Sequence, residues 1–365
     1  MAGLIVHEWF EQYGGAEKVV EEMAGVFPDA GIACLWDDYP GRFARRPVTE
    51  SWLARTSLRR HKSVALPFML PTWRSIRVPE VPDWILCSSH LFAHHAKLDG
   101  TFGEVPKYVY AYTPARYIWN PELDQRGNSP VAKLVSKPLQ AVDRARAKEA
   151  ASIACVSEFV RSRVQDAWQR DCEVIHPPVN FEYYASSRQH ELDAAELDVL
   201  GYLPGTYVLG ASRFIPYKRL DLVIEFGAVN DIPVVLAGGG PEEDHLRTLA
   251  ASAPVPVLFV SKPSQALLRE LYARALAYIF PPVEDFGIMP VEANAAGTPV
   301  VAGRIGGSAE TVANGVSGVL LDSFSPSEMR AAAGSLTSIT AEDCGRQATE
   351  FEEATFREAI ERLVG

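Results

Sequence analysis

The sequence predicts an α/β protein with two doubly wound, Rossmann-like domains that face each other across a cleft. Short apolar runs without polar alternation recur between amphipathic helical stretches, a pattern typical of parallel strands covered by helices on both faces. The predicted strands cover 4–6, 32–35, 84–87, 108–111, 152–156 and 173–175 in a first series, and 207–210, 234–237, 257–260, 277–280, 300–302 and 319–321 in a second. Two such series indicate two domains, which a length of 365 residues can accommodate.

The break between the two series lies near His176-Pro177-Pro178, because two prolines exclude helix and interrupt strand pairing. We therefore expect an N-terminal domain at 1–172, a C-terminal domain at 173–347, and a C-terminal helix at 348–365 that is a candidate to return to the N-terminal domain. Since ligands of doubly wound sheets bind at the carboxyl ends of the strands, we expect the functional site in the cleft.

The composition is that of an ordinary soluble globular protein, with 47% hydrophobic and 22% charged residues. A formal net charge of −11 argues against nucleic acid as the main partner. No apolar run reaches the roughly 18 residues of a membrane-spanning helix, and the first residues lack a signal-peptide pattern, so we expect a cytoplasmic protein. The five cysteines form no C-x-x-C spacing and no Cys/His cluster, so we expect buried thiols and no metal site.

Positive charge is concentrated in 42–77, which contains nine basic residues and one acid and so carries +8. Trp52, Phe68 and Trp73 are among the apolar residues interleaved with these bases. Basic residues contribute about 1 kcal/mol each near an anionic bilayer, and Trp side chains sit well at the headgroup level. The segment therefore fits a peripheral anchor on an anionic membrane surface, at the inner face of the cell membrane, or else a solvated basic face over an ordinary core.

Two cations follow the predicted strand 207–210, with Arg213 in a loop and Lys218 just before a helix that begins near Leu220. Arg offers a planar fork to phosphate oxygens and Lys offers a point charge. The pair therefore suits a diphosphate leaving group that gains negative charge, although two surface charges would give the same pattern.

Three glycines, Gly238, Gly239 and Gly240, directly follow the predicted strand 234–237. Residues without side chains let a ligand approach the backbone, and they also make tight turns between a strand and a helix. We keep Gly238 and Gly239 as candidate ligand-binding residues. No G-x-G-x-x-G spacing occurs, so a nicotinamide site has little support.

Glu284 and Glu292 lie eight positions apart across a loop that runs into a predicted helix. Pro290 is well placed in the first turn of this helix and Gly297 just beyond its end. The loop 285–289 then presents backbone N–H groups and a helix N-terminus, which favour phosphate or sugar oxygens. The two carboxylates can hold opposite ends of one extended ligand, or they are two solvated acids.

Several segments spread over nearly the whole chain carry a family resemblance: HEWFEQYGGAEKVVEEM, PDWILCSSHLFAHHAK, VYAYTPARYIW, IACVSEFVRSRV, VIHPPVNFEYY, SRFIPYKRLDLVIE, AGGGPE, EDFGIMPVEA and AAGTPVVAGRIGGSAETV. Together they resemble the retaining family 4 glycosyltransferases of the GT-B fold, closest to bacterial mannosyltransferase-like members of polysaccharide and glycolipid assembly. The resemblance implies an acceptor-side N-terminal domain, a C-terminal domain that binds a nucleotide sugar, no cofactor, and no metal in the active site.

The resemblance also assigns roles to single residues. Arg213 and Lys218 match the pair that binds the diphosphate. Glu284 matches the acid that faces the hydroxyls of the donor sugar, and Glu292 the acid that hydrogen-bonds the ribose. The backbone of Phe286, Gly287, Ile288 and Met289 matches the segment that holds sugar and phosphate. Gly14 and Gly15 match the N-terminal loop that approaches the diphosphate. The implied mechanism keeps the anomeric configuration, with a donor phosphate oxygen assisting deprotonation of the acceptor hydroxyl.

One position departs from the family. Many relatives have a His before the Thr-Pro of the segment that here reads Tyr110-Ala-Tyr-Thr-Pro114, and this chain has Tyr112. Tyr112 is therefore a candidate catalytic residue. The histidines His90, His94 and His95 follow the predicted strand 84–87 and are candidates for contact with the acceptor or the donor, or they are structural.

We therefore expect a retaining, metal-independent hexosyltransferase, with GDP-mannose as the leading donor and a lipid-linked or oligosaccharide acceptor. One alternative is a glycosyltransferase that uses a UDP-sugar and a small soluble acceptor. This alternative predicts an activity that does not depend on lipid. Another is a non-catalytic subunit that binds a nucleotide sugar within a polysaccharide assembly complex.

Overall fold

The computed structural model describes residues 2–12, 14–43, 46–98, 105–119 and 130–365. The chain divides into two compact units, the first comprising Met1–Pro178 with Ala354–Gly365 and the second Val179–Glu353. The boundary expected at 172/173 comes too early, because strand β7 (Glu173–Val174) pairs with β6 (Ser152–Cys155) in the sheet of the first unit. The two units are described separately below.

The first unit is built on a seven-stranded parallel sheet in the order β3-β2-β1-β4-β5-β6-β7. Besides β6 and β7, its strands are β1 (Gly3–His7), β2 (Gly31–Cys34), β3 (Val48–Glu50), β4 (Trp84–Ser89) and β5 (Lys107–Ala111). The runs GLIVH of β1 and WILCSS of β4 are buried throughout, as expected for strands covered on both faces. Because all strands are parallel, their carboxyl ends meet at one edge of the sheet.

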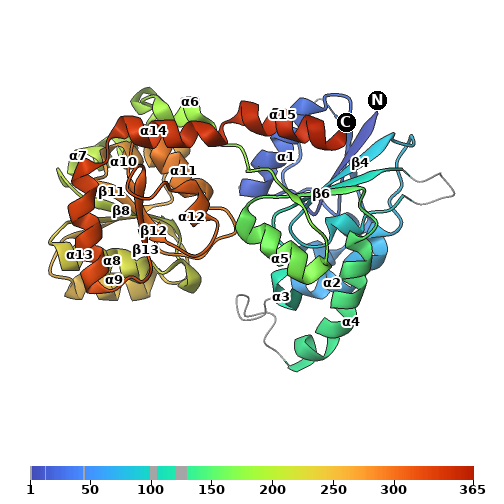
Figure 1. The fold of residues 1–365 in the computed structure, drawn as a ribbon, viewed down its shortest axis with the longest axis horizontal. Helices are drawn as coiled ribbons and strands as arrows, with labels where there is room; N and C mark the ends of the chain where they lie inside the picture. Colours follow the sequence, from blue (N-terminus) through green and yellow to red (C-terminus); the bar gives the residue numbers. More distant parts are fainter. Residues whose placement is uncertain (1, 13, 44–45, 99–104, 120–129) are drawn as a thin grey trace. The chain divides into compact units, whose positions relative to one another are not determined.

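Helices connect the strands of the first unit and cover the sheet. They are α1 (Gly15–Val26), α2 (Lys62–Trp73), α3 (Arg116–Trp119), α4 (Pro130–Ala147), α5 (Glu158–Trp168) and α15 (Glu353–Val364), with short 3-10 segments η1 (Trp52–Arg55), η2 (Ser57–Arg60) and η3 (Ala93–His95). The C-terminal helix α15 lies beside α1 (Figure 1), and its Arg357 pairs with Glu22 of α1 at 2.7 Å. From the same helix, Phe356 contacts the Tyr110 ring of β5 at a centroid distance of 5.8 Å.

The second unit is built on a six-stranded parallel sheet in the order β10-β9-β8-β11-β12-β13. Its strands are β8 (Val208–Arg213), β9 (Val234–Gly239), β10 (Val257–Ser261), β11 (Ala277–Phe280), β12 (Val300–Gly303) and β13 (Gly318–Leu321). The expectation of two parallel, Rossmann-like sheets in an α/β fold is confirmed.

Helices also cover the second sheet. They are α6 (Phe181–Ala185), α7 (Ala194–Tyr202), α8 (Leu220–Asn230), α9 (Glu243–Ser252), α10 (Gln265–Arg274), α11 (Ile288–Ala295), α12 (Ser308–Thr311), α13 (Pro326–Ser335) and α14 (Ala341–Ala348), with short segments η6 (Gln189–Glu191), η7 (Pro216–Lys218), η8 (Leu336–Ser338) and η9 (Thr349–Phe351). A buried core joins Val223 and Phe226 of α8, Val234 of β9 and Met329 of α13. This core lies under α8 and α13, while α11 packs on α14 and α6 (Figure 1).

Across the described residues, no helix is both long enough and apolar enough to cross a membrane.

Candidate functional site

A lysine and a glutamate from adjacent strands meet in the second unit. Lys218 ends η7, which follows β8, and Glu284 follows β11; β8 and β11 pair in parallel in the sheet. The Lys218 Nζ forms an ion pair with Glu284 Oε1 and lies 5.9 Å from the centroid of the Phe280 ring. Lys218 is only 9% exposed, so this cation is largely desolvated at the carboxyl ends of these strands.

Arg213 is the last residue of β8 and is paired in register with Gly239 at the end of β9. Its side chain is exposed and makes no hydrogen bond or ion pair with a residue that the structure describes. Since β8 neighbours both β9 and β11, Arg213 and the Lys218–Glu284 pair occupy the same edge of the sheet. At this edge Arg213, which pairs with no described residue, thus lies beside Lys218, which is already paired.

Glu292 is 6% exposed in the middle of α11 and is surrounded by tyrosines. The Tyr272 hydroxyl donates to Glu292 Oε2 at 3.5 Å. The Tyr184 ring, from α6, lies 6.3 Å from the Tyr272 ring. Burial raises the pKa of both tyrosines, and the nearby Glu292 carboxylate raises it further, so both phenols remain protonated donors. Sequence reasoning found Glu292 but not these tyrosines, although Tyr184 lies in the VIHPPVNFEYY segment.

The segment from Glu284 to Gly287 is held by the loop that follows β12. The Gly307 N–H donates to the Glu284 carbonyl at 2.8 Å, and a Cβ at Gly307 would overlap the Asp285 carbonyl oxygen. Gly287 has a φ of 94° and precedes α11 without any side-chain cap. The N–H groups in the first turn of α11 therefore lack a side-chain cap, and an uncapped helix N-terminus favours an anion.

Of the backbone candidates in this segment, Phe286 is 4% exposed and contacts the Phe351 ring at 5.6 Å. Ile288 and Met289 are half-buried in the first turn of α11, where the Met289 sulfur lies 3.6 Å from the Tyr278 hydroxyl. The loop expected over 285–289 thus ends at Gly287, because the helix begins at Ile288.

The glycines after β9 have a structural explanation. Gly238 and Gly240 have φ values of 142° and 155°, which L side chains rarely adopt. A Cβ at Gly238 would overlap the Ser212 carbonyl oxygen, and one at Gly240 would lie 2.5 Å from the Phe214 carbonyl oxygen. Close packing on the end of β8 and on Phe214 directly after it thus accounts for both glycines without a ligand. Gly239 has more room, with its nearest neighbour Lys262 at 3.6 Å.

In the first unit, Gly14 and Gly15 begin α1. A Cβ at Gly14 would overlap the Glu17 carboxylate, which is 5% exposed and accepts the Glu11 N–H at 3.2 Å. The space that the missing side chain leaves at Gly14 is therefore filled by an acid of the same helix.

Tyr112 links three elements at the carboxyl edge of the first sheet. Its N–H donates to the Ser89 carbonyl at 2.9 Å, and its hydroxyl donates to the Ala16 carbonyl at 3.2 Å and lies 3.0 Å from Ser88 Oγ. Burial raises the pKa of this phenol, so it stays neutral. Tyr112 thus has a clear structural role in joining β4, β5 and α1.

His94 and His95 both face a buried aspartate, Asp143 of α4. Their Nε2 atoms lie 3.0 and 2.9 Å from Asp143 Oδ1, and the indole N–H groups of Trp119 and Trp168 donate to Oδ2 at 2.8 and 2.7 Å. Neither histidine is more than 1% exposed. Their surroundings give no support to the interpretation of His94 and His95 as acceptor contacts.

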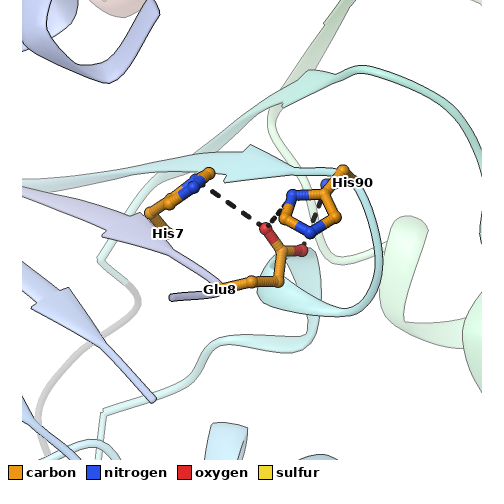
Figure 2. Close-up of side chains that lie close together, drawn as sticks. All are labelled: His7, Glu8 and His90. Carbon is orange, nitrogen blue, oxygen red and sulfur yellow. Dashed lines mark hydrogen bonds and ion pairs between the residues drawn. The ribbon is translucent and has the colours of Figure 1, made fainter. Parts of the chain in front are cut away.

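His90 differs from these two histidines because 30% of its side chain is exposed. It faces Glu8, which directly follows β1 and is fully buried; His90 Nδ1 lies 3.0 Å from Glu8 Oε2 (Figure 2). His7 completes the group, with its Nδ1 3.8 Å from the same oxygen and 3.2 Å from the Ser88 carbonyl. Sequence reasoning missed Glu8, which lies in the HEWF segment.

Among the described residues of the first unit, two groups bring three possible metal ligands within 4.8 Å of one another: His7, Glu8 and His90, and His94, His95 and Asp143. In both groups the carboxylate already accepts several N–H groups of the protein. We interpret both groups as hydrogen-bond networks.

Comparison with known proteins places residues 203–351 in the family described as "Glycosyl transferases group 1". The chain is 31% identical over 198 residues to the GDP-mannose-dependent alpha-(1-6)-phosphatidylinositol monomannoside mannosyltransferase of Mycolicibacterium smegmatis, with 50% of this chain and 51% of that protein covered. It is 34% identical over 151 residues to the D-inositol 3-phosphate glycosyltransferase of Acidothermus cellulolyticus, with 37% of this chain and 34% of that protein covered. The chain thus matches about half, or less, of the length of these curated relatives.

Solved structures are similar over nearly the full length. Anabaena Alr3699/HepE in complex with UDP-glucose has a TM-score of 0.71 at 18% identity, with 99% of each chain covered. Sucrose-phosphate synthase from Thermosynechococcus elongatus has a TM-score of 0.72 at 14% identity, with 100% of this chain and 98% of that chain covered. At these identities the likeness shows the fold alone.

Proposed function

We propose that this chain, which belongs to the group 1 glycosyl transferases and has the GT-B fold, transfers a hexose from a nucleotide diphosphate sugar to a glycan or glycolipid hydroxyl. The observation that carries the proposal is the Lys218–Glu284 ion pair at the sheet edge that also bears Arg213, within the matched region 203–351. One lysine flanked by one acid and one unpaired arginine suits a ligand that has both hydroxyls and a diphosphate.

In the proposed reaction, Arg213 and Lys218 stabilise the negative charge that grows on the diphosphate as the glycosidic bond breaks. Glu284 accepts hydrogen bonds from hydroxyls of the transferred sugar. The acceptor hydroxyl attacks from the face that the diphosphate leaves, and a phosphate oxygen of the leaving group takes its proton. The new bond therefore keeps the anomeric configuration of the donor.

Glu292 is proposed to bind the ribose of the donor. Its burial beside Tyr272 and Tyr184 supports this role, because the tyrosine hydroxyls can fix one carboxylate oxygen while the other accepts from a ribose hydroxyl. The uncapped start of α11 and the backbone of Phe286, Gly287, Ile288 and Met289 are proposed to face the sugar and phosphates, since backbone N–H groups there favour anionic oxygens.

GDP-mannose is the proposed donor, supported by the GDP-mannose dependence of the Mycolicibacterium relative. A UDP-sugar with a small acceptor is the second candidate, because other relatives are D-inositol 3-phosphate glycosyltransferases and HepE was solved with UDP-glucose. Thermal-shift measurements with GDP, UDP and their sugars separate the two, since a ligand at roughly 100 Kd adds about 2.7 kcal/mol to the free energy of unfolding.

Turnover itself is tested by GDP or UDP release with candidate donors and acceptors. The proposal expects release that depends on acceptor and that falls sharply in Lys218→Ala, while Glu292→Ala weakens the use of the donor. Nucleotide-sugar binding without turnover, even with acceptor present, would favour the non-catalytic alternative. Unchanged turnover in Glu292→Ala would rule out the ribose assignment.

The segment 42–77 is proposed to hold the protein on an anionic membrane surface at the cytoplasmic side. An apolar patch supports this: Trp52 is 51% exposed, Val64 57% and Phe68 43%, and the Trp52 and Phe68 rings meet edge to face at 6.2 Å. Arg55 and Arg60, on η1 and η2, are exposed within the same segment.

Several basic side chains of this segment instead bind other groups of the protein. Arg42 pairs with Glu21, Arg46 donates to the carbonyl groups of Ala24 and Phe27, and Arg74 pairs with Glu149. Arg45 lies outside the described residues. The membrane proposal therefore depends on the apolar patch and on Arg55 and Arg60, and flotation with anionic liposomes tests it. Trp52→Ser with Phe68→Ser should abolish flotation at low salt, and wild-type protein that fails to float contradicts the proposal.

A further inference from the structure

Glu8 and His90 are brought together by the topology of the first sheet. Glu8 directly follows β1 and His90 directly follows β4, and these neighbouring strands are in register with His7 opposite Ser88. Both residues therefore leave the sheet at its carboxyl edge, where doubly wound folds bind their ligands. Figure 2 shows the Glu8 carboxylate lying between the two imidazole rings.

The Glu8 carboxylate is held rigidly on one side. Its Oε1 atom accepts the N–H groups of His90 at 3.1 Å, Leu91 at 2.9 Å and Ala93 at 3.0 Å. The Ser89 hydroxyl donates to the same atom at 3.3 Å. A fully buried carboxylate is costly unless it is paired, and these donors fix its position so that Oε2 faces His90 Nδ1.

This arrangement leaves the other nitrogen of His90 available. With Nδ1 committed to Glu8, Nε2 makes no hydrogen bond with any residue in the described part of the chain, and the His90 side chain is the exposed member of the group. A carboxylate at Nδ1 stabilises the imidazolium form, in which both nitrogens carry protons. His90 can thus present a charged N–H donor at the edge of the sheet.

We infer that Glu8 is a positioning residue that holds His90 as a charged hydrogen-bond donor, and that His90 Nε2 contacts an oxygen of the transferred sugar or of its acceptor. This inference rests on the proposed function. The Tyr112 and His90 rings lie 6.4 Å apart at the same edge.

The other charged or titratable groups around His90 come from four elements. Burial alone lowers the pKa of His90, while Glu8 and, from α1, Glu17 raise it, and Lys62 of α2 lowers it; the net shift is upward. His7 of β1 lies 5.5 Å away, and burial lowers its pKa to about 4, so it is neutral near pH 7. Tyr112 is neutral as well. Glu8 is therefore the closest charge that keeps His90 protonated.

Removing the Glu8 charge while keeping its shape gives the sharpest test. In Glu8→Gln the amide oxygen can still accept the backbone N–H groups, but its amide nitrogen would donate to His90 Nδ1 and favour a neutral ring. Because the charged form of His90 exists below its pKa, lowering that pKa moves the alkaline limb of kcat/KM to lower pH. We expect this shift in Glu8→Gln, with activity closest to wild type at the acidic end of the profile and a further loss in His90→Gln.

Asp143→Asn is the matched control, because Asp143 is another buried carboxylate that faces two histidines in the same unit, neither of which is exposed. It should lower the melting temperature without moving the alkaline limb. Histidine NMR titration of the full chain gives a second readout that does not need turnover. His90→Gln identifies the His90 signal, and Glu8→Gln should lower the pKa read from that signal.

Donor and acceptor contacts are separated by steady-state kinetics. If His90 contacts the donor, His90→Gln slows donor hydrolysis without acceptor and raises the donor KM. If it contacts the acceptor, only the acceptor KM rises. An alkaline limb and a His90 titration that are both unchanged in Glu8→Gln would overturn the inference and leave Glu8 a structural residue. Absence of turnover by the wild-type protein would instead count against the proposed function, and the NMR titration would still decide whether Glu8 controls His90.

Discussion

Lys218 and Glu284 form an ion pair although they lie 66 positions apart in the chain. The parallel pairing of β8 with β11 brings them together, because each residue follows the carboxyl end of its strand. Lys218 is largely buried, whereas the Glu284 side chain is 21% exposed. An incoming phosphate can therefore approach a lysine whose position is already fixed, and this preorganisation is what makes a cation effective in stabilising developing charge.

Lys218→Met tests this relationship, because Met fills a similar volume without the charge. We expect kcat to fall by about 100-fold or more, the usual effect of removing a preorganised donor. The folded state should survive, since Glu284 keeps contact with solvent. Arg247→Met is the matched control: it breaks the Arg247–Glu243 pair at 2.7 Å on the exposed face of α9, where a surface pair contributes about 0–1 kcal/mol. Equal activity loss in both variants would contradict the role of Lys218.

Tyr272→Phe removes the hydroxyl that donates to Glu292. We expect the KM for the donor to rise and the thermal shift caused by free nucleotide to shrink, because the ribose-binding carboxylate is less well fixed, while kcat changes little. Tyr207→Phe is the control, since it also removes a buried hydroxyl, one that donates to the Leu271 carbonyl at 2.8 Å. A donor KM that rises equally in both variants would indicate a general loss of stability.

Most strands could be predicted from the sequence because they are short, uninterrupted apolar runs. A strand that is covered by helices on both faces of the sheet needs apolar residues on both faces. The edge strand β3 was missed, since its sequence VTE contains a single apolar residue. The boundary expected at 172/173 lies a few residues before Pro178, where this part of the first unit ends, although the strand 173–175 was already predicted in the first series.

Some residues of the candidate site could likewise be predicted from the sequence, and others could not. Arg213 ends a strand, Lys218 and Glu284 follow strands, and Glu292 lies on the helix after the same loop as Glu284. Their positions therefore follow from local sequence and from the family resemblance. The partners that orient them do not. Tyr272 reaches Glu292 from another helix, and nothing in the sequence near either residue marks the contact. The sequence likewise groups His90 with His94 and His95, but buried carboxylates far away in the chain, Glu8 and Asp143, give them different surroundings.

Gly307→Ala tests whether the loop after β12 supports the segment that bears Glu284. The added Cβ would overlap the Asp285 carbonyl oxygen, so the segment must shift. We expect weaker nucleotide-sugar binding, measured by calorimetry, together with a lower melting temperature. Gly334→Ala on α13 is the control, because its Cβ would meet nothing within 4 Å and replacing a helical Gly by Ala stabilises by roughly 0.5–1 kcal/mol. Normal binding in Gly307→Ala would show that the loop does not position Glu284.

The last prediction concerns the stability of the first unit at mildly acidic pH. Burial lowers the pKa of His7 to about 4, and burial together with His94 lowers that of His95 to about 4. In the unfolded chain both groups titrate near about 6.5, so below that pH the unfolded state binds protons that the folded state cannot take up. The free energy of unfolding should therefore fall between pH 6.5 and 4, by up to about 1.4 kcal/mol per pH unit for each histidine. The raised pKa of His90 acts with the opposite sign, but its contribution is already complete below about pH 6 and adds no slope there.

Denaturant melts at pH 7, 6, 5 and 4.5 measure the slope of the free energy of unfolding against pH. His95→Gln should reduce it, and His190→Gln, at a position where 72% of the side chain is exposed, should leave it unchanged. A slope that persists unchanged in His95→Gln would mean that this histidine is protonated in the folded protein.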